Sequence, residues 1–257
     1  GAYCWVNANE FLLKVPKLAQ FYVHGGNIIE VKLFDEADVG LLNYYLQGYM
    51  LAILMQQRKH LVLHGTVLQR QGVAIAICGV SGIGKTTLGA SLIQHGWSLV
   101  SDDLCVFDTD GRVMQGASDL KIWPDVAETL LLENAVPFSD SLTKLQLNTN
   151  VNNSSGTSYI NDYFPLSAIF CLTEAVAEST IKQYKGMHKF APLKSNSYRP
   201  QFMKAMGQDA LFMQHCSSFL SHTPVYSLCR TQGKLSSDKL NHLTSILTRS
   251  LEGNSEL

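Results

Sequence analysis

The stretch AIAICGVSGIGKTTLGASLIQHGWSLVSDD, residues 74–103, decides the fold that we expect for this chain. It begins with a short apolar run, continues through a glycine-rich loop into a helical pattern that Gly96 ends, and closes on a second apolar run followed by two aspartates. The predicted order is therefore strand, glycine loop, helix, strand and acidic pair, which is typical of an α/β nucleotide-binding core.

The glycine loop satisfies the pattern G-x-x-x-x-G-K-[ST] in the context that the pattern requires, after a strand and at the start of a helix. In such a loop, backbone N–H groups surround phosphate oxygens, the lysine reaches the β and γ phosphates, and the hydroxyl binds Mg²⁺. The alternative is a glycine turn that binds nothing, which the extra Gly82 and the flanking elements disfavour. The predicted nucleotide-binding residues are Gly79, Val80, Ser81, Gly82, Ile83, Gly84, Lys85, Thr86 and Thr87.

Asp102 and Asp103 follow the second strand, at the edge where the phosphates are expected. One carboxylate can complete a Mg²⁺ shell with Thr86, and the other can accept a proton from an attacking hydroxyl. The alternative is a pair that only caps the next turn. His64 lies on the preceding β-like run, residues 61–69, and pairing Gln69 with Gly72 would place His64 opposite Ile77, close to the phosphates.

Outside this core, we expect a hairpin over residues 22–34, a buried helix over 38–58 and a strand over 167–172. Further helices are predicted over residues 124–134, 201–220 and 236–251, and the Asn/Ser-rich stretch 148–158 is predicted to be a mobile loop. No break in composition forces a division, so we predict one domain over residues 1–257: residues 1–60 packed on the core, the core at 61–230 and a C-terminal helix at 231–257.

The composition excludes several classes of protein. Lys plus Arg number 20 against 21 Asp plus Glu, a net charge of −1, which argues against nucleic-acid binding. The longest apolar run, residues 49–55, is far shorter than the about 18 residues of a membrane span. The six cysteines form no CxxC spacing and the eight histidines no HExxH motif, so neither disulfides nor zinc are expected. Without a secretory pattern, we predict a cytoplasmic protein.

Residues 61–107 resemble the catalytic core of the HPr kinase/phosphorylase family, in which a His-Gly strand, a P-loop and an Asp-Asp pair occur in this order. The resemblance rests on the block LHGTVLQRQGVAIAICGVSGIGKTTLGASLIQHGWSLVSDDLCVF, residues 63–107. Weaker similarity continues through DLKIWPD, PLSAIFCL, SYRP and PVYSL, as in relatives that include lasso peptide kinases. The resemblance implies an α/β P-loop kinase core of the HPr kinase and phosphoenolpyruvate carboxykinase type, with a mixed sheet flanked by helices.

The same resemblance implies ATP and Mg²⁺ as cofactors, and transfer of the γ-phosphoryl group to a serine hydroxyl of a peptide or protein. It implies Asp102 as catalytic base, Asp103 with Thr86 on the metal side, His64 and Lys85 as supporting groups, and Arg199 at the transferring phosphate. Lys121 and Lys144 are further basic candidates, and assembly into homo-oligomers is expected. The chain departs from classical members at Val80 and Thr87 and lacks their Glu-Val-Arg-Gly-Leu-Gly signature, which favours an acceptor other than HPr.

Two other functions fit the same residues. A small-molecule kinase acting on a polyol or sugar would use the same chemistry with a different acceptor, because acceptor contacts come from variable loops. A regulatory module would bind ATP without transferring phosphate, but it would need only one of the two carboxylates. The absence of N-K-x-D, H-R-D and D-F-G motifs disfavours a GTPase and a eukaryotic-type protein kinase.

Overall fold

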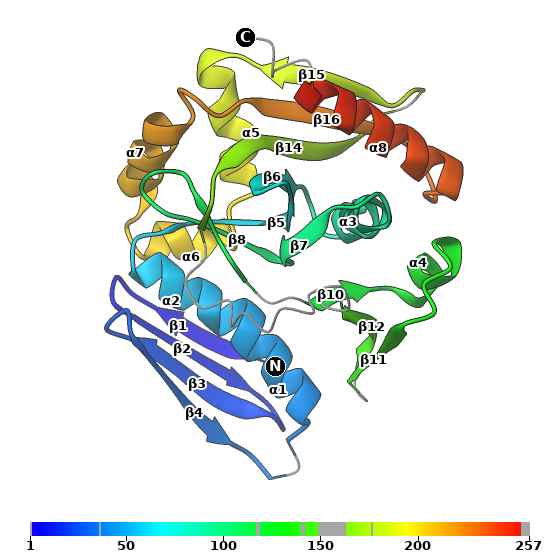
Figure 1. Cartoon of the computed structure of the whole chain (residues 1–257). Helices are drawn as coiled ribbons and strands as arrows, with labels where there is room; N and C mark the ends of the chain where they lie inside the picture. The colour runs from blue at the N-terminus through cyan, green and yellow to red at the C-terminus, as the bar shows by residue number, and fades with distance from the viewer. Residues whose placement is uncertain are drawn as a thin grey trace.

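The centre of the molecule is a mixed β-sheet with helices on both faces (Figure 1). The computed structural model describes residues 2–35, 37–116, 119–139, 142–148, 163–175 and 177–252. Within these residues the strand order is β13-β9-β8-β5-β6-β14-β16-β15, and β7 also pairs with β5. The strands are β5 (Leu61–Arg70), β6 (Val73–Cys78), β7 (Ser98–Ser101), β8 (Leu104–Phe107), β9 (Val113–Met114), β13 (Tyr163–Phe164), β14 (Leu166–Ala175), β15 (Thr180–Tyr184) and β16 (Val225–Thr231).

Side chains that alternate along the strands fill two separate cores, as the two-residue period of a strand requires. Ile75 and Ile77 of β6 face α3 (Lys85–Gln94) and α8 (Ser237–Glu252), whereas Ala74, Ala76 and Cys78 face the opposite side. That side is covered by η3 (Gly186–Lys189), α5 (Phe190–Ser195), α6 (Pro200–Ala205) and α7 (Asp209–Phe219). The expected mixed sheet flanked by helices is confirmed.

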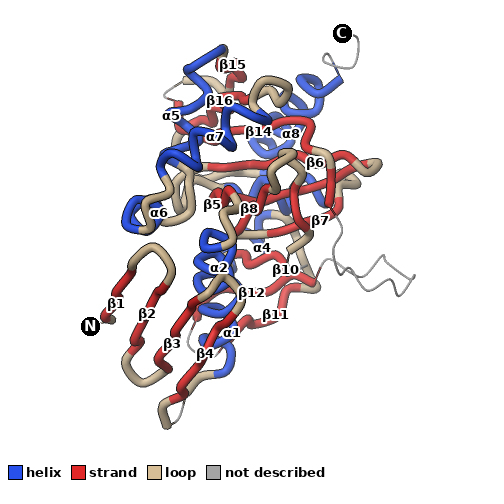
Figure 2. Tube along the Cα trace, turned by 90° about the vertical axis from the view of Figure 1, so that its left-hand side faces the viewer, coloured by secondary structure: helices blue, strands red, loops and turns tan. Residues whose placement is uncertain are grey.

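The N-terminal part is a four-stranded antiparallel sheet under a helix (Figure 2). Its strands are β1 (Tyr3–Val6), β2 (Glu10–Val15), β3 (Ala19–His24) and β4 (Ile28–Leu33). The predicted hairpin is therefore β3–β4, and the two earlier strands were not predicted. The helix expected over residues 38–58 is capped by Asp38 but is interrupted: α1 (Val39–Tyr44) and α2 (Leu51–Gln57) flank a π-helical segment, η1 (Tyr45–Met50).

A small sheet of order β10-β12-β11 lies beside the N-terminal end of α3. It contains β10 (Asp119–Ile122), β11 (Ala135–Ser139) and β12 (Leu142–Asn148), with α4 (Pro124–Thr129) between β10 and β11. The prediction of one helix over 124–134 was thus too long. The helix predicted over 201–220 is also wrong as one element, because Gly207, with φ of 71°, separates α6 from α7. Residues 149–158 of the predicted loop lie outside the described residues.

The predicted strand pairing near the P-loop needs a correction. β5 and β6 form the expected hairpin, but Arg70 pairs with Val73 and Gly65 with Cys78. The turn therefore holds only Gln71 and Gly72, both at positive φ, and the register is shifted by two residues from the prediction. His64 consequently lies beyond the end of β6 and pairs instead with Leu104 of β8.

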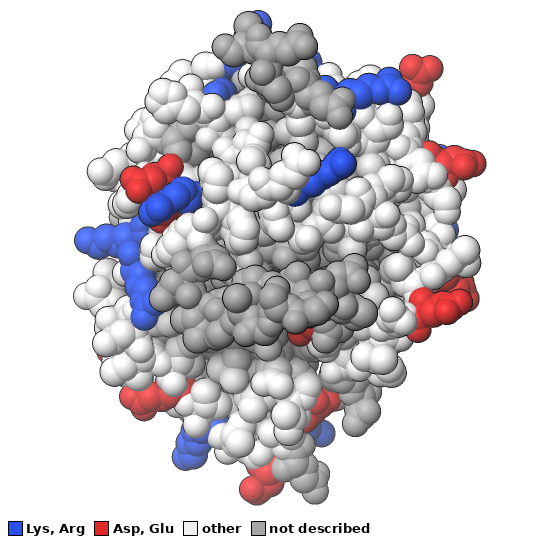
Figure 3. Space-filling model, viewed as in Figure 1, with Lys and Arg blue, Asp and Glu red and all other residues white. Residues whose placement is uncertain are grey.

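The described residues contain no disulfide and no membrane-spanning helix. All six cysteines lie in described ranges and none forms a disulfide. No helix there is long and apolar enough to cross a membrane. On the face shown in Figure 3, acidic and basic side chains are scattered and do not gather into a field of one sign.

Candidate active site

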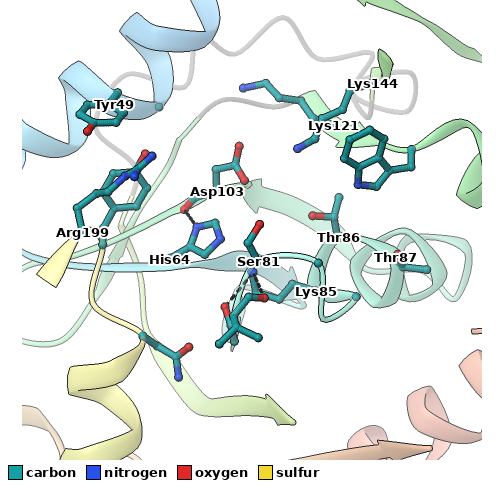
Figure 4. A pocket seen from close by; sticks show the side chains of 18 of the residues that line it. Tyr49, His64, Ser81, Lys85, Thr86, Thr87, Asp103, Lys121, Lys144 and Arg199 are labelled. Carbon is teal, nitrogen blue, oxygen red and sulfur yellow. Dashed lines mark hydrogen bonds between the residues drawn. The ribbon is translucent and has the colours of Figure 1, made fainter. Parts of the chain in front are cut away.

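A cavity of about 730 Å³ lies where the P-loop meets the end of β5, the π-helical segment, the small sheet and the start of α6. It is lined by residues that are far apart in the sequence, from Tyr44 to Gln201. Most of its walls come from outside the strand–loop–helix unit of residues 74–103. Figure 4 shows residues that line it, among them P-loop residues, Asp103 and Arg199.

The P-loop forms the floor of the cavity. Gly84 has φ of 106°, a conformation that side chains with a Cβ avoid, and it serves as the N-cap of α3. The Lys85 Nζ donates to the carbonyl oxygens of Gly79 and Val80, at 2.9 and 3.0 Å. Burial lowers the pKa of Lys85, opposed by the nearby aspartates. The loop thus presents backbone amides and a held ammonium to the cavity, as an anion site requires.

Ile83 is the one predicted P-loop residue whose side chain does not line the cavity. It is buried in the core between the sheet and α3. Its carbonyl oxygen accepts a hydrogen bond of 2.8 Å from Nε of Arg230, at the end of β16. Arg230 is itself buried, donates to the carbonyls of Thr231 and Gly233, and forms an ion pair with Glu174. Sequence reasoning missed this contact, because only the parallel order of β6, β14 and β16 brings Arg230 to the loop.

Asp102 points away from the cavity. Its Oδ1 accepts from the hydroxyls of Thr66, at 2.8 Å, and Thr86, at 3.3 Å, and its Oδ2 accepts from the backbone N–H of Lys121 at 3.2 Å. Burial, reinforced by the charge of Asp103, raises the pKa of Asp102 to about 6, while the Thr66 hydrogen bond opposes the rise. Asp102 is therefore joined to the Thr86 hydroxyl but is not among the cavity-lining residues.

Asp103 lines the cavity and is held in the left-handed region, with φ of 67°. Non-glycine residues in this region are uncommon and cluster at functional sites. Its backbone carbonyl accepts from Nδ1 of His64 at 3.1 Å, the contact dashed in Figure 4. Because a carbonyl can only accept, Nδ1 carries the proton. Burial, with Lys85 nearby, lowers the pKa of His64, so the ring is neutral and its Nε2 is an acceptor.

The end of the cavity beyond Asp103 is aromatic and basic. Tyr44 and Tyr49 enter it from α1 and the π-helical segment, and Tyr198 enters from the residues before α6. Arg199 has φ of 51°, and its guanidinium lies 4.6 Å from the centre of the Tyr49 ring. Lys121 and Lys144 also line the cavity; the Lys121 Nζ lies over Tyr44, and the Lys144 Nζ lies over Trp123.

The oxygen atoms around Thr86 suit Mg²⁺. This ion takes oxygen ligands, commonly one or two carboxylates together with substrate phosphates. The Thr86 hydroxyl and the Asp102 carboxylate are adjacent, and Asp103 lies on the cavity side of them. The described residues contain no group of three or more His, Cys, Asp or Glu that could hold a metal ion. The donor set therefore fits a Mg²⁺ ion that also binds phosphate.

The structure brings together almost all of the site residues that the sequence proposed. His64, Lys85, Asp103, Arg199 and the loop apart from Ile83 line one cavity, and Asp102 contacts it through Thr86. The tyrosines, Trp123 and Arg230 were not predicted as site residues, although Trp123 and Tyr198 lie in the segments DLKIWPD and SYRP.

Comparison with known proteins covers the central part of the site. The HPr Serine kinase C-terminal domain family matches residues 55–123. This segment of the chain is therefore similar to part of the HPr kinases. The matched segment contains His64, the P-loop and both aspartates, but it ends before Arg199 and Arg230.

Curated relatives named HPr kinase/phosphorylase are similar to parts of the chain. The protein from Aromatoleum aromaticum is 27% identical over 154 residues, 49% of this chain and 49% of the relative. That from Chloroherpeton thalassium is 39% identical over 59 residues, 23% of this chain and 17% of the relative. The chain thus spans about half or less of the length of these HPr kinases. The solved Hpr(Ser) kinase/phosphatase from Coxiella burnetii aligns with 76% of this chain and 99% of that chain, with 10% identity and a TM-score of 0.39.

Proposed function

We propose that this protein is an ATP-dependent kinase that transfers the γ-phosphoryl group to a serine hydroxyl of a peptide or protein. The observation that carries the proposal is one cavity that joins a P-loop to a carboxylate, a neutral histidine and an arginine. Phosphoryl transfer depends mainly on positioning and on stabilising charge, and these groups supply both.

The donor phosphates would be held by the P-loop amides and Lys85. The Lys85 Nζ already donates to two loop carbonyls, so it is fixed at the floor of the cavity before a phosphate arrives. Thr86 and Asp102 would hold Mg²⁺, which neutralises phosphate charge when bound. Asp102 suits this role because its carboxylate is fixed by three hydrogen bonds beside the Thr86 hydroxyl.

Asp103 would accept the proton of the attacking hydroxyl, because its carboxylate lines the cavity. The bond from His64 to its backbone carbonyl fixes the strained residue in place. This proposal reverses the roles expected from the family resemblance, in which Asp102 is the base. The physical reason is orientation: the Asp102 carboxylate points into the protein and Asp103 into the cavity.

The acceptor would enter at the end formed by Tyr44, Tyr49 and Arg199. Aromatic rings there can pack against a peptide chain, and the guanidinium can stabilise charge on the transferring phosphoryl group. The departures at Val80 and Thr87 favour a peptide over folded HPr as the proposed acceptor.

The decisive experiment incubates the purified protein with Mg-ATP and, separately, serine-containing peptides, purified HPr and a panel of polyols and sugars, and detects added phosphate by mass spectrometry. We expect phosphate on serine peptides. Labelling of a polyol or sugar alone would identify a small-molecule kinase, and binding of Mg-ATP without transfer to any acceptor would identify a regulatory module.

Single-turnover kinetics then divide the roles of the two aspartates. Asp103→Asn should lower the transfer rate by about 10²–10⁴, the usual loss for a general base, at an unchanged Mg²⁺ requirement. Asp102→Asn should instead raise the Mg²⁺ concentration needed for half-maximal rate. Lys85→Met should abolish nucleotide binding. A larger rate loss for Asp102→Asn at saturating Mg²⁺ would restore the original assignment.

A further inference from the structure

The lining of the cavity differs in chemistry from one end to the other. One end carries Tyr49, Tyr198 and Arg199, and Tyr44 contacts the small sheet through Lys121 and Phe138. The other is an apolar wall of the small sheet and α4, made by Ile122, Trp123 and Val126, with Thr87 among the neighbouring lining residues. In Figure 4, Thr86 and Thr87 lie on one side of Asp103, and Arg199 lies on the other.

The position of the transfer chemistry gives the cavity a direction. This step rests on the proposed function. The acceptor hydroxyl must meet the terminal phosphate beside Asp103 and His64, and an in-line displacement places acceptor and leaving group on opposite sides of that phosphate. The nucleoside must therefore leave the P-loop away from Arg199, toward the Ile122–Val126 side.

We propose that Trp123 is the stacking platform for the nucleobase. Its side chain is 50% exposed, an unusual state for a large aromatic residue, and it faces the cavity at the end of β10. The buried apolar residues Ile122 and Val126 also line the cavity. The Lys144 ammonium lies 5.6 Å from the centre of the indole ring, so a cation adjoins the flat apolar surface. The Trp123 ring could therefore stack on the base of a nucleotide, and the Lys144 ammonium could contact the phosphates of the same nucleotide.

Stacking on a planar ring tolerates different bases because each base has a π face. The proposal therefore predicts a site that prefers a nucleoside triphosphate over bare tripolyphosphate but distinguishes weakly among purines. The indole side chain makes no cap hydrogen bond for α4, whose first turn is held by the Trp123 backbone carbonyl. Replacing the ring should therefore leave the helix intact.

The test compares Mg-ATP with magnesium tripolyphosphate by calorimetry on the full chain. Trp123→Ala should weaken Mg-ATP binding by about 5- to 150-fold, the usual range for a lost base–aromatic stack, and leave tripolyphosphate affinity within twofold. Trp123→Phe should restore most of the loss. Mg-ATP should also quench tryptophan fluorescence, and the quenching should disappear in Trp123→Phe but persist in Trp5→Phe, because Trp5, on β1 of the N-terminal sheet, does not line the cavity.

The outcomes separate this inference from the proposed function. Suppose that tripolyphosphate binds to the wild-type protein. If Trp123→Ala then weakens the binding of tripolyphosphate as much as that of Mg-ATP, or weakens the binding of neither compound, Trp123 is not the base platform, but the P-loop site is still supported. If Trp123→Ala raises only the KM of the acceptor, the direction assigned to the cavity is wrong. If neither Mg-ATP nor tripolyphosphate binds the wild-type protein, both proposals fail.

Discussion

At the scale of single residues, the buried Asp102 makes the stability of the protein depend on pH in an unusual direction. Its pKa in the folded protein is raised to about 6, whereas in the unfolded chain it is about 4. The folded state thus binds the proton more tightly, and the Asp102 contribution to the unfolding free energy is lost as pH rises from about 4 to 6. Without nucleotide or Mg²⁺, this loss amounts to at most about 3 kcal/mol.

The variant Asp102→Asn removes this titration. We expect its unfolding free energy relative to wild type, measured by urea denaturation, to increase between pH 4 and pH 6 and to level off above. Asp103→Asn is the control. It keeps the titrating carboxyl of Asp102 but removes the Asp103 charge that helps to raise the pKa of Asp102, so the pH range over which stability is lost should become narrower. An unfolding free energy of Asp102→Asn that falls relative to that of wild type as pH rises would contradict the assignment.

At the scale of elements, Arg230 at the end of β16 donates a hydrogen bond to the backbone of the P-loop. Arg230 joins the Ile83 carbonyl to Glu174 and to the turn after β16. Arg230→Met should leave buried carbonyls without a donor, costing about 1–3 kcal/mol of stability, and should weaken Mg-ATP binding by about tenfold, since the loop amides lose their fixed orientation. Thermal unfolding and calorimetry measure the two effects.

A matched control for this prediction is Arg112→Met. Arg112 is half exposed, pairs with Asp108 and lies away from the P-loop. Such a pair contributes up to about 1 kcal/mol, and its loss should not change Mg-ATP affinity. Equal nucleotide affinity in wild type and Arg230→Met would show that the arginine stabilises the fold without orienting the loop.

At the scale of the whole molecule, one core joins the N-terminal sheet to the site. Phe11 of β2 is fully buried, and its ring centre lies 5.2 Å from that of Phe202 in α6 and 6.0 Å from that of Tyr49. Phe11→Ala should cost about 3–5 kcal/mol. Because α6 begins directly after Arg199, we also expect a higher KM for the acceptor at an almost unchanged KM for ATP.

The aromatic control is Trp5→Ala, which changes a half-exposed side chain on the outer face of the same sheet and should cost less than about 0.5 kcal/mol. If Phe11→Ala does not fold, Phe11→Leu serves as the milder variant. Two separate unfolding transitions in wild type, one confined to the N-terminal sheet, would show that this sheet folds independently of the core.

Local chemistry made part of this protein predictable from its sequence. The P-loop, the following helix and the acidic pair lie within 30 consecutive residues. The spacing of the glycines, the helical periodicity and the lysine–threonine pair predict this unit because its structure depends on residues that are close in the sequence. The β5–β6 hairpin was predicted from its apolar runs, but not its register, because a two-residue turn at Gln71 and Gly72 gives a different pairing from the one assumed.

The sequence by itself determined that the chain has a phosphate-binding loop with carboxylates and a histidine close by, since each is encoded by neighbouring residues. Only the tertiary structure decided which aspartate faces the cavity, because a positive φ at Asp103 turns the two carboxylates in different directions. It also decided that Tyr49, Trp123 and Arg230 lie around the loop. These residues are separated by tens of positions, and their contacts depend on strand order and core packing, which no local pattern records.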